Sequence, residues 1–457
     1  MKVVKFGGSS LASGPVVENA VKIILSDPER RVVVTSAPGK RDPNDVKVTD
    51  LLIKFAEHVV HHKDWKDVAQ RIFRRYTDIG SYFNIPEEEI EPLRKQLFSL
   101  PTVHYPNRDY LLAAFKAHGE CLNAQLIAKV LTSKGANARY VDPKVAGIQV
   151  TGTPNNATVS PETYLSLENL EYSDNEILVF PGFYGYTMAG HIATFSRGGS
   201  DITGAILARG FHADLYENFT DVDAIFSANP TVVDNPRPIS TMTYREMREL
   251  SYAGFSVFHD EALIPAIQGQ IPINVKNTRH PEKRGTMIVP EKGFTPENTV
   301  TGIASSKHFA ALYLHKYLLN KEVGFTLRLL RILSNHNVPY EHMPTGIDDL
   351  TIIFDKNYLT DALVDEICDE IQSEVNPDKL EWHDDYAIIM VVGEGMRDHI
   401  GVLRDIVTPV SNAGISFTLV NQGSSQISIM VGTTVKDADN AVRAIYNYLF
   451  TGENDND

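Results

Sequence analysis

The stretch Lys2-Val3-Val4-Lys5-Phe6-Gly7-Gly8-Ser9-Ser10 decides how the fold is interpreted. An apolar strand pattern ends in two glycines, and a helical pattern follows over residues 16–25, with apolar residues at spacings of 3 and 4. Residues 31–35 then contain a β-branched run that is typical of a strand buried on both faces. Strand, helix and strand in this order form a βαβ unit, so we expect a parallel sheet with right-handed crossovers.

Similar patterns continue this organisation to residue 290. The predicted helices cover residues 49–62, 65–84, 86–100, 108–133, 201–210, 243–250 and 261–268. The predicted strands cover residues 138–141, 176–181, 191–195, 213–218, 272–276 and 285–289. Together they predict an α/β domain over residues 1–290, with three layers around a mostly parallel sheet.

The order and spacing of the predicted helices and strands change after residue 290. Residues 291–305 are predicted to be a linker, because proline and charged residues interrupt the periodic patterns. Strands expected over 308–314 and 386–392 each open a similar passage of strand, turn, glycine and helix. These passages indicate an internal repeat of about 70 residues. We place its copies at 306–380 and 381–452, followed by an acidic tail, 453–457, that is predicted to be disordered.

The composition argues against several classes of protein. The chain has 457 residues, with 43 Lys and Arg against 58 Asp and Glu and a formal charge of −15, so nucleic acid and anionic membranes are poor partners. Its two cysteines, Cys121 and Cys368, form neither a CxxC motif nor a disulfide framework. We identify no signal peptide and no apolar stretch long enough to span a membrane. A cytoplasmic protein is therefore expected.

The first polar motif follows the opening strand. Gly7 and Gly8 allow backbone N–H groups to close on an anion, and the helix after them adds a partial positive charge. Lys5 is expected to point along the strand into the same crevice. A glycine turn beside a solvated lysine explains this short motif as well.

Two further polar motifs follow later strands. Residues 196–201 read Ser-Arg-Gly-Gly-Ser-Asp, which places the carboxylate-binding fork of Arg197 at a strand end, where open α/β sheets bind ligands. Asp201 in this motif also suits the start of a helix. Residues 220–223, Thr-Asp-Val-Asp, offer carboxylates to Mg²⁺, sugar hydroxyls or an amine, or form an acidic turn. Glu120, within a long predicted helix, carries a weak signal by itself.

Taken together, these motifs resemble those of the aspartate kinase family. Residues 5–10 resemble its N-terminal signature, 197–201 its second Gly-rich loop, 220–223 its third motif, 251–254 its fourth, and 275–278 the stretch before its last kinase-domain strand. Their order and spacing agree over essentially the whole chain. The C-terminal repeat is similar to the paired ACT domains of these enzymes. The resemblance therefore implies a kinase domain followed by two ACT-like α+β domains with the order βαββαβ.

The resemblance also implies a reaction. Family members transfer the γ-phosphoryl group of ATP to the β-carboxylate of L-aspartate, the first step toward lysine, threonine and methionine. A carboxylate is already ionised at pH 7, so this nucleophile needs no general base. Catalysis then reduces to positioning and charge stabilisation, which explains why no catalytic histidine is evident. We expect a monofunctional enzyme that uses ATP and Mg²⁺, with the ion held mainly by ATP phosphates.

The family's functional residues can be assigned to positions of this sequence. Lys5, Arg197 and Asp201 are expected to be catalytic: Lys5 stabilises the transferring phosphoryl group, Arg197 clamps a substrate carboxylate, and Asp201 lies near the reacting groups. The expected nucleotide-binding residues are Lys5, Gly7, Gly8, Ser9, Thr220, Asp221, Phe226 and Lys276. The expected aspartate-binding residues are Ser36, Thr49, Glu120, Arg197, Gly198, Gly199 and Ser200.

Three positions depart from the family pattern. Phe226, Thr231 and Ser256 stand where the family usually has a Tyr, an Arg and a Lys beside the nucleotide. The lost hydroxyl and cations concern the ATP side, whereas the aspartate side shows no comparable loss. Lys276 is a candidate replacement cation, by position alone.

The ACT-like repeat is interpreted as a sensor. Gly324, Phe325, Met343, Thr345 and Asp348 fall where lysine-sensitive family members bind their effector. Free backbone N–H groups there could take the carboxylate of an amino acid. We expect lysine rather than threonine as effector, and a homodimer or tetramer through these domains, although the repeat could serve dimerisation alone.

Two other functions are open. A relative in the same superfamily could act on N-acetylglutamate, glutamate or UMP, which the ACT-like repeat disfavours. An amino-acid-binding regulator that has lost kinase activity is motivated by the three departures above. The retained Lys5, Arg197 and Asp201 oppose it.

Overall fold

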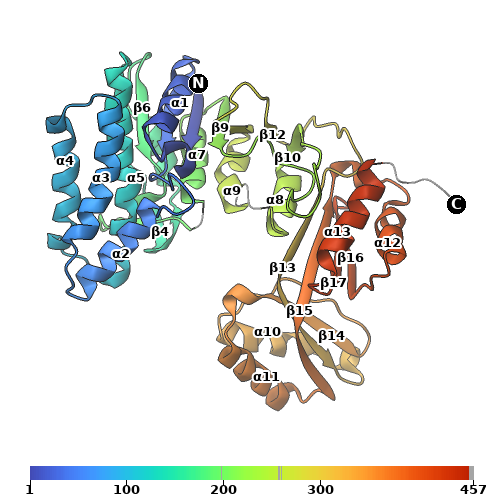
Figure 1. Ribbon diagram of the computed structural model, residues 1–457. Coiled ribbons are helices and arrows are strands. Elements are labelled where there is room, and N and C mark those ends of the chain that lie inside the picture. Colours follow the sequence, from blue (N-terminus) through green and yellow to red (C-terminus); the bar gives the residue numbers. More distant parts are fainter. Residues whose placement is uncertain (197, 256–257, 259, 452–457) are drawn as a thin grey trace. The chain divides into compact units, whose positions relative to one another are not determined.

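The computed structural model describes residues 1–451 except residues 197, 256–257 and 259 (Figure 1). The chain forms two compact units. The first contains Met1–Ile225, Pro238–Arg248 and Ser256–Thr295, and the second contains Phe226–Arg237, Glu249–Phe255 and Pro296–Asp457. The tail predicted to be disordered, residues 453–457, lies outside the described residues.

An eight-stranded sheet forms the centre of the first unit, in the order β10-β12-β11-β9-β1-β2-β6-β3. β1 (Lys2–Phe6) pairs in parallel with β2 (Arg30–Thr35) and β9 (Leu215–Thr220). The other strands are β3 (Ala138–Tyr140), β6 (Ile177–Pro181), β10 (Thr241–Thr243), β11 (Ile273–Asn277) and β12 (Thr286–Val289). β11 and β12 pair antiparallel and the other neighbours pair in parallel, so the predicted mostly parallel sheet is confirmed.

Helices cover both faces of this sheet. Val4 and Phe6 of β1 pack in one core with α1 (Gly14–Leu25), α2 (Val48–Val60), α3 (Lys66–Tyr82), α4 (Glu87–Ser99) and α5 (Arg108–Ser133). Lys5, between them on the strand, points to the opposite face and meets α7 (Gly199–Gly210), as the alternation of side chains along a strand requires. The remaining helices are α6 (Glu162–Glu168), α8 (Tyr244–Tyr252) and α9 (Asp260–Gly269). The predicted three-layer organisation is confirmed.

Several short elements were not predicted. β4 (Val150–Thr153) and β5 (Asn156–Val159) form a two-stranded sheet, and β7 (Tyr184–Tyr186) is a further short strand. Its partner β8 (Ile192–Thr194) corresponds to the predicted strand 191–195 but lies outside the main sheet. Strands of three or four residues are too short for a clear alternation of apolar and polar residues. The same limit hides the short 3₁₀ turns η1 (Gly8–Leu11), η2 (Leu100–Thr102), η3 (Leu319–Lys321), η4 (Lys356–Tyr358) and η5 (Glu394–Met396).

The second unit contains a five-stranded antiparallel sheet in the order β14-β13-β15-β17-β16. Its strands are β13 (Gly302–His315), β14 (Asp349–Asp355), β15 (Lys379–Val392), β16 (Leu419–Gln422) and β17 (Ser428–Thr433). Its helices are α10 (Phe325–Asn335), α11 (Asp361–Val375), α12 (Val402–Asn412) and α13 (Ala438–Tyr446), and α13 continues into a π-helical turn, Asn447–Thr451. Each half contains two helices and packs them with strands of the same sheet, and β16 and β17 follow one another directly in the second half.

The two long strands of this unit serve both halves of the repeat. β13 and β15 run side by side, with Gly302 opposite Val392 at one end and His315 opposite Lys379 at the other (Figure 1). Ile303 of β13 lies in the core that contains α12 and α13, whereas Leu312 lies in the core that contains α10 and α11. β13 thus begins inside the predicted linker 291–305, and β15 crosses the limit predicted near residue 380. The domain limits stay a prediction.

Candidate active site

Three neighbouring strands of the first unit end side by side, at what we call the carboxyl edge of the sheet. β1, β2 and β9 are parallel and in register, so their loops start together. The Gly7 N–H donates to the Phe219 carbonyl at 3.1 Å, and the Ser36 N–H donates to the Phe6 carbonyl at 3.2 Å. The Gly-rich motif after β1 therefore lies between the other two loops, at the edge where open α/β sheets bind ligands.

Two backbones approach closely at this edge. The Gly39 N–H donates to the Gly8 carbonyl at 2.8 Å. A Cβ atom on Gly8 would lie 2.9 Å from the Ala37 carbonyl oxygen, and one on Gly39 would lie 2.7 Å from the Gly8 backbone. Glycine is therefore required at both positions, and the loops after β1 and β2 form one continuous surface of backbone groups.

Lys5 joins the strands to helix α7. Its Nζ lies 2.6 Å from Asp201 Oδ1 and 3.3 Å from Asn218 Oδ1, while Asn218 Nδ2 donates to Asp201 Oδ1 at 2.8 Å. The Lys5 and Asp201 side chains are only 9% and 13% exposed, so little water screens their attraction. Because an ammonium has three N–H donors, Lys5 keeps one for a ligand beyond these contacts.

The second Gly-rich loop leads into α7. Gly198 has φ +73°, a left-handed conformation that suits glycine, and Asp201 N–H donates to the Gly198 carbonyl at 2.8 Å. Gly199 and Ser200 are buried against the loop after β6: a Cβ on Gly199 would lie 2.4 Å from the Phe183 ring. Arg197, predicted to clamp a carboxylate, lies outside the described residues.

Glu120 of α5 faces the loop after β2. Its Oε1 accepts the Ala37 N–H at 3.0 Å, whereas its Oε2 is buried without a hydrogen-bond partner among the described residues. Burial raises the pKa of Glu120 to about 8. Nearby, Asn123 Nδ2 donates to the Ser36 carbonyl at 2.7 Å. The structure thus brings the predicted Ser36 and Glu120 together, and Thr49 lies in the first turn of α2, the helix that follows the same loop.

The third motif follows β9. Thr220 Oγ1 donates to Asp221 Oδ1 at 3.2 Å, and the Asp221 side chain is exposed. Asp223 is 2.5 Å from Lys283 Nζ and 2.6 Å from Asn277 Nδ2, and these two contacts, that of Lys283 first, lower its pKa. Asp221, rather than Asp223, is therefore the carboxylate of this motif that is presented to solvent.

Lys276 is not brought to the same place as Lys5. It pairs with Phe219 in the register of β11 and β9, and its Nζ lies 5.9 Å from the Phe219 ring centroid. Phe219 packs in the core on the face of Val4 and Phe6, whereas Lys5 and Asn218 point to the α7 face. Burial lowers the pKa of Lys276. Its predicted part in nucleotide binding stays a prediction, and the two lysines lie on opposite faces of the sheet.

The fourth motif, residues 251–254, and Phe226–Arg237, which come shortly after the third motif, lie in the second unit. Phe226 and Thr231 belong to it, and the part of Phe226 in nucleotide binding stays a prediction. Tyr252 of the fourth motif donates its hydroxyl hydrogen to Glu341 at 2.6 Å, within this unit. Ser256 lies outside the described residues.

The predicted effector residues lie at the start of α10 and in the loop before β14. Gly324 is the N-cap of α10 with φ +79°, and Phe325 beside it is buried. Met343 packs against the same core, and the Thr345 backbone bridges to Leu350. Asp348 is already engaged, because its Oδ1 accepts the Leu318 N–H at 2.8 Å. The loop before β14 is therefore held by hydrogen bonds, and the Asp348 carboxylate caps the backbone turn at Leu318.

Two side chains of the carboxyl edge were not among the predicted site residues. Asn218, within β9, completes the contacts of Lys5 and Asp201, and Asn123 holds the loop that contains Ser36. A polar residue inside a buried strand or helix face is a usable signal, because such groups are normally retained for a hydrogen bond. Neither residue belongs to a motif that stands out by its spacing.

The described residues contain no group of three or more His, Cys, Asp or Glu side chains that could hold a metal ion. No described helix is long and apolar enough to cross a membrane.

Comparison with known proteins gives two family matches. Residues 1–277 match the model described as the amino acid kinase family, and residues 389–449 match an ACT domain. Over 452 residues the chain is 47% identical to aspartokinase 3 of Bacillus subtilis, covering 99% of each protein.

Solved structures agree with the fold. The Clostridium acetobutylicum aspartate kinase is 38% identical, with a TM-score of 0.84, over 98% of this chain and all of that one (100%). Escherichia coli aspartokinase III in complex with aspartate and ADP is 23% identical, with a TM-score of 0.80, over 98% of this chain and 100% of that one. The same protein with lysine and aspartate is 24% identical, with a TM-score of 0.76, over 98% and 99%.

Proposed function

The chain belongs to the aspartokinases of the amino acid kinase family, and from this premise we propose that it transfers the γ-phosphoryl group of ATP to the β-carboxylate of L-aspartate. The observation that carries the proposal is the ion pair of Lys5 and Asp201 beside the Gly8 and Gly39 backbones. A cation and the backbone of the first Gly-rich loop meet there at the carboxyl edge. Such a site suits an anionic group that is being transferred.

The phosphate donor is assigned to the loop after β1. Gly8 and Ser9 offer backbone N–H groups to the phosphates, while Gly7 holds the start of this loop through its N–H bond to the Phe219 carbonyl. Lys5 neutralises charge that spreads over the transferred phosphoryl oxygens. Asp201 and Asn218 keep the Lys5 ammonium on the α7 face, 2.6 Å and 3.3 Å from its Nζ. In this proposal Mg²⁺ takes its ligands mainly from ATP phosphates, and when bound it supplies further positive charge at these oxygens.

The acceptor is assigned to the loop after β2 and to α5. Its β-carboxylate attacks without a base, since it is ionised at neutral pH. Glu120 Oε2, buried without a partner among the described residues, is suited to the substrate ammonium, which would favour the charged carboxylate. Ser36 and Thr49 complete this side. Because Arg197 is outside the described residues, its part as carboxylate clamp rests on the sequence alone.

Feedback control by lysine is the regulatory part of the proposal. It is supported by the lysine complex of the Escherichia coli relative and by the organised loop around Gly324 and Asp348. The enzyme would then work in the cytoplasm at the first step toward lysine, threonine and methionine.

A homodimer or tetramer through the ACT-like halves is proposed for the same region. Val323, just before α10, is 96% exposed, and Ile400, just before α12, is 96% exposed as well. Leu318, Leu327 and Ile347 add exposed apolar surface to the first half. Large apolar side chains with this degree of exposure are candidates for burial against another copy of the chain.

The test is aspartate-dependent acyl phosphate formation from Mg-ATP, trapped with hydroxylamine. We expect hydroxamate with L-aspartate. We expect none with N-acetylglutamate or glutamate, and no phosphorylation of UMP in a matched assay. Bound ATP and aspartate without hydroxamate would refute the proposal and favour an inactive regulator. Suppression by lysine and not by threonine would identify the effector.

A further inference from the structure

Arg75 of α3 is a charged side chain in the interior of the first unit, with the residue only 3% exposed. Its Nη1 lies 2.9 Å from Asp45 Oδ2 and donates to the Val46 carbonyl at 3.1 Å. Its Nη2 donates to the Ala12 carbonyl at 3.3 Å and also to the Gly39 carbonyl. One guanidinium therefore contacts three separate stretches of backbone.

These stretches belong to the two loops of the carboxyl edge. Ala12 is the C-cap of η1, the turn that follows the first Gly-rich motif. Gly39, Asp45 and Val46 lie in the loop between β2 and α2. Because a guanidinium is planar and presents its donors in a fixed fork, it sets both the distance and the orientation between its acceptors.

Gly39 carries this contact directly to the glycine motif. Its carbonyl accepts from Arg75, and its N–H donates to the Gly8 carbonyl at 2.8 Å. Neither Gly8 nor Gly39 has room for a Cβ atom, so the backbones of the two loops are in close contact. A displacement of Arg75 would therefore be felt at the backbone of Gly8.

We propose that Arg75 is a positioning residue that aligns the loop after β1 with the loop after β2 for phosphoryl transfer. It touches neither substrate. This inference rests on the proposed function, in which the first loop holds the phosphates and the second holds aspartate. An alignment role is expected to appear in turnover, since a displacement of about 1 Å between reacting groups can cost about 100-fold in rate.

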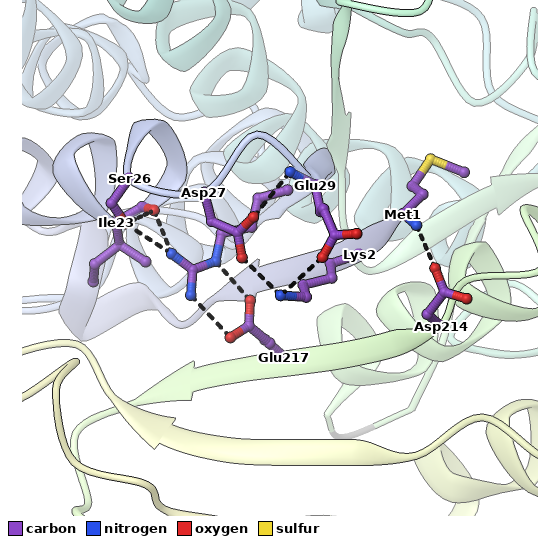
Figure 2. A network of polar contacts seen from close by, with 9 residues as sticks. Met1, Lys2, Ile23, Ser26, Asp27, Glu29, Asp214 and Glu217 are labelled. Atoms are coloured by element: carbon purple, nitrogen blue, oxygen red, sulfur yellow. Dashed lines mark hydrogen bonds and ion pairs between the residues drawn. The ribbon is translucent and has the colours of Figure 1, made fainter.

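Arg30 supplies a matched control. Its guanidinium binds Glu217 through Nε at 2.6 Å and Nη2 at 2.9 Å, and through Nη1 it donates to the Ile23 carbonyl at 2.6 Å. Figure 2 shows Ile23, Ser26 and Glu217 of this network. Like Arg75, Arg30 joins a carboxylate to a backbone carbonyl, here that of Ile23. It begins β2, however, so it lies at the opposite end of the strands from the glycine loops.

The experiment compares Arg75→Ala with Arg30→Ala in the full chain, after correction for the folded fraction. Arg75→Ala should lower kcat about 100-fold with KM for ATP and aspartate changed only a few-fold, because alignment rather than binding is lost. Millimolar guanidinium should restore turnover of Arg75→Ala in a saturable way, and leave wild type and Arg30→Ala unchanged. Arg30→Ala should lose thermal stability and keep its kcat.

Two results would overturn the inference. One is equal kcat for the two variants per folded molecule, and the other is the lack of any guanidinium effect on Arg75→Ala. If Arg75→Ala does not fold, Asp45→Asn takes its place: it releases one contact of the guanidinium, and an unchanged kcat would count against the inference. An inactive wild type would refute the proposed function instead, so the two failures are distinguishable.

Discussion

The two edges of the same eight-stranded sheet treat their buried polar groups differently. At the amino edge, Lys2 lies 2.7 Å from Asp27 and 3.2 Å from Glu29, and Arg30 is paired with Glu217 (Figure 2). At the carboxyl edge, the buried atoms Thr35 Oγ1, Arg75 Nε, Glu120 Oε2 and Asn123 Oδ1 lack a hydrogen-bond partner among the described residues. The amino edge therefore pairs its charged groups and has one such atom, Asn274 Oδ1, beside Glu217 in the register of β11 and β9. The carboxyl edge has four, of which Glu120 Oε2 is the one that we assign to a substrate.

This difference indicates that the amino edge of the sheet contributes mainly to stability and the carboxyl edge mainly to ligand binding. A buried polar atom without a partner costs free energy, so four such atoms at one edge are a cost that a stable scaffold elsewhere must offset. The paired charges of the amino edge and the apolar core of α1–α5 supply that scaffold. Substitutions of the same kind at the two edges should therefore have different consequences.

Two lysines of one strand give the largest expected contrast. Lys5→Ala should lower kcat by about 10³-fold with little change in the KM for aspartate, because it removes charge stabilisation that matters most in the transition state. Lys2→Ala removes ion pairs at the amino edge and should keep full kcat at a stability cost below about 1 kcal/mol. Steady-state kinetics and urea unfolding of both variants measure the contrast. Equal kcat values would remove the role proposed for Lys5.

Two buried glutamates give the next contrast. Glu120→Gln should raise the KM for aspartate about 10- to 100-fold, because a charged hydrogen bond to the substrate ammonium is lost. Glu217→Gln, which breaks the pairing with Arg30, should leave this KM unchanged and destabilise the fold by about 3 kcal/mol. An unchanged KM in Glu120→Gln would show that the ammonium binds elsewhere.

The pH dependence of the unfolding free energy gives a second test of Glu120. The pKa of Glu120 is raised to about 8 in the folded chain, from a usual value of 4.5, because the carboxyl is buried. The contribution of Glu120 to the free energy of unfolding is therefore complete below the pKa that this group has in the unfolded chain. It is lost as pH rises toward 8, by about 1.4 kcal/mol per pH unit. Urea unfolding at several pH values should show a flatter dependence for Glu120→Gln than for wild type. Parallel curves would contradict the raised pKa.

Much of this edge was predictable, because it follows strand ends. The pattern of strand, glycines and helix located Lys5 and Asp201 from local sequence alone. Their pairing depends on the strand order, which places β9 beside β1 and brings α7 over Lys5. Rules on strand order and crossover handedness reduce the number of possible sheet topologies. They do not predict the 2.6 Å contact between Lys5 and Asp201.

The missed features depend on tertiary packing. Arg75 lies on an amphipathic helix, where an arginine is usually solvated, and nothing in its neighbours indicates that loops from two other elements surround it. The start of β13 at Gly302 was hidden for a related reason. Its partner in the sheet is Val392, far away in the sequence, so the local pattern resembles a linker.

Two glycines give the smallest contrast and test the backbone surface itself. Gly8→Ala should lower kcat about tenfold, because its Cβ would lie 2.9 Å from the Ala37 carbonyl and push the two loops apart. Gly135, between α5 and β3 toward the amino edge, has φ +86°, and no described atom would lie within 4 Å of a Cβ at this position. Gly135→Ala should therefore cost about 1 kcal/mol of stability through backbone strain and leave kcat unchanged. Kinetics and thermal unfolding separate the two causes. A Gly8→Ala enzyme with full turnover would mean that the loops can separate without consequence, and that the carboxyl edge is less constrained than its backbone contacts indicate.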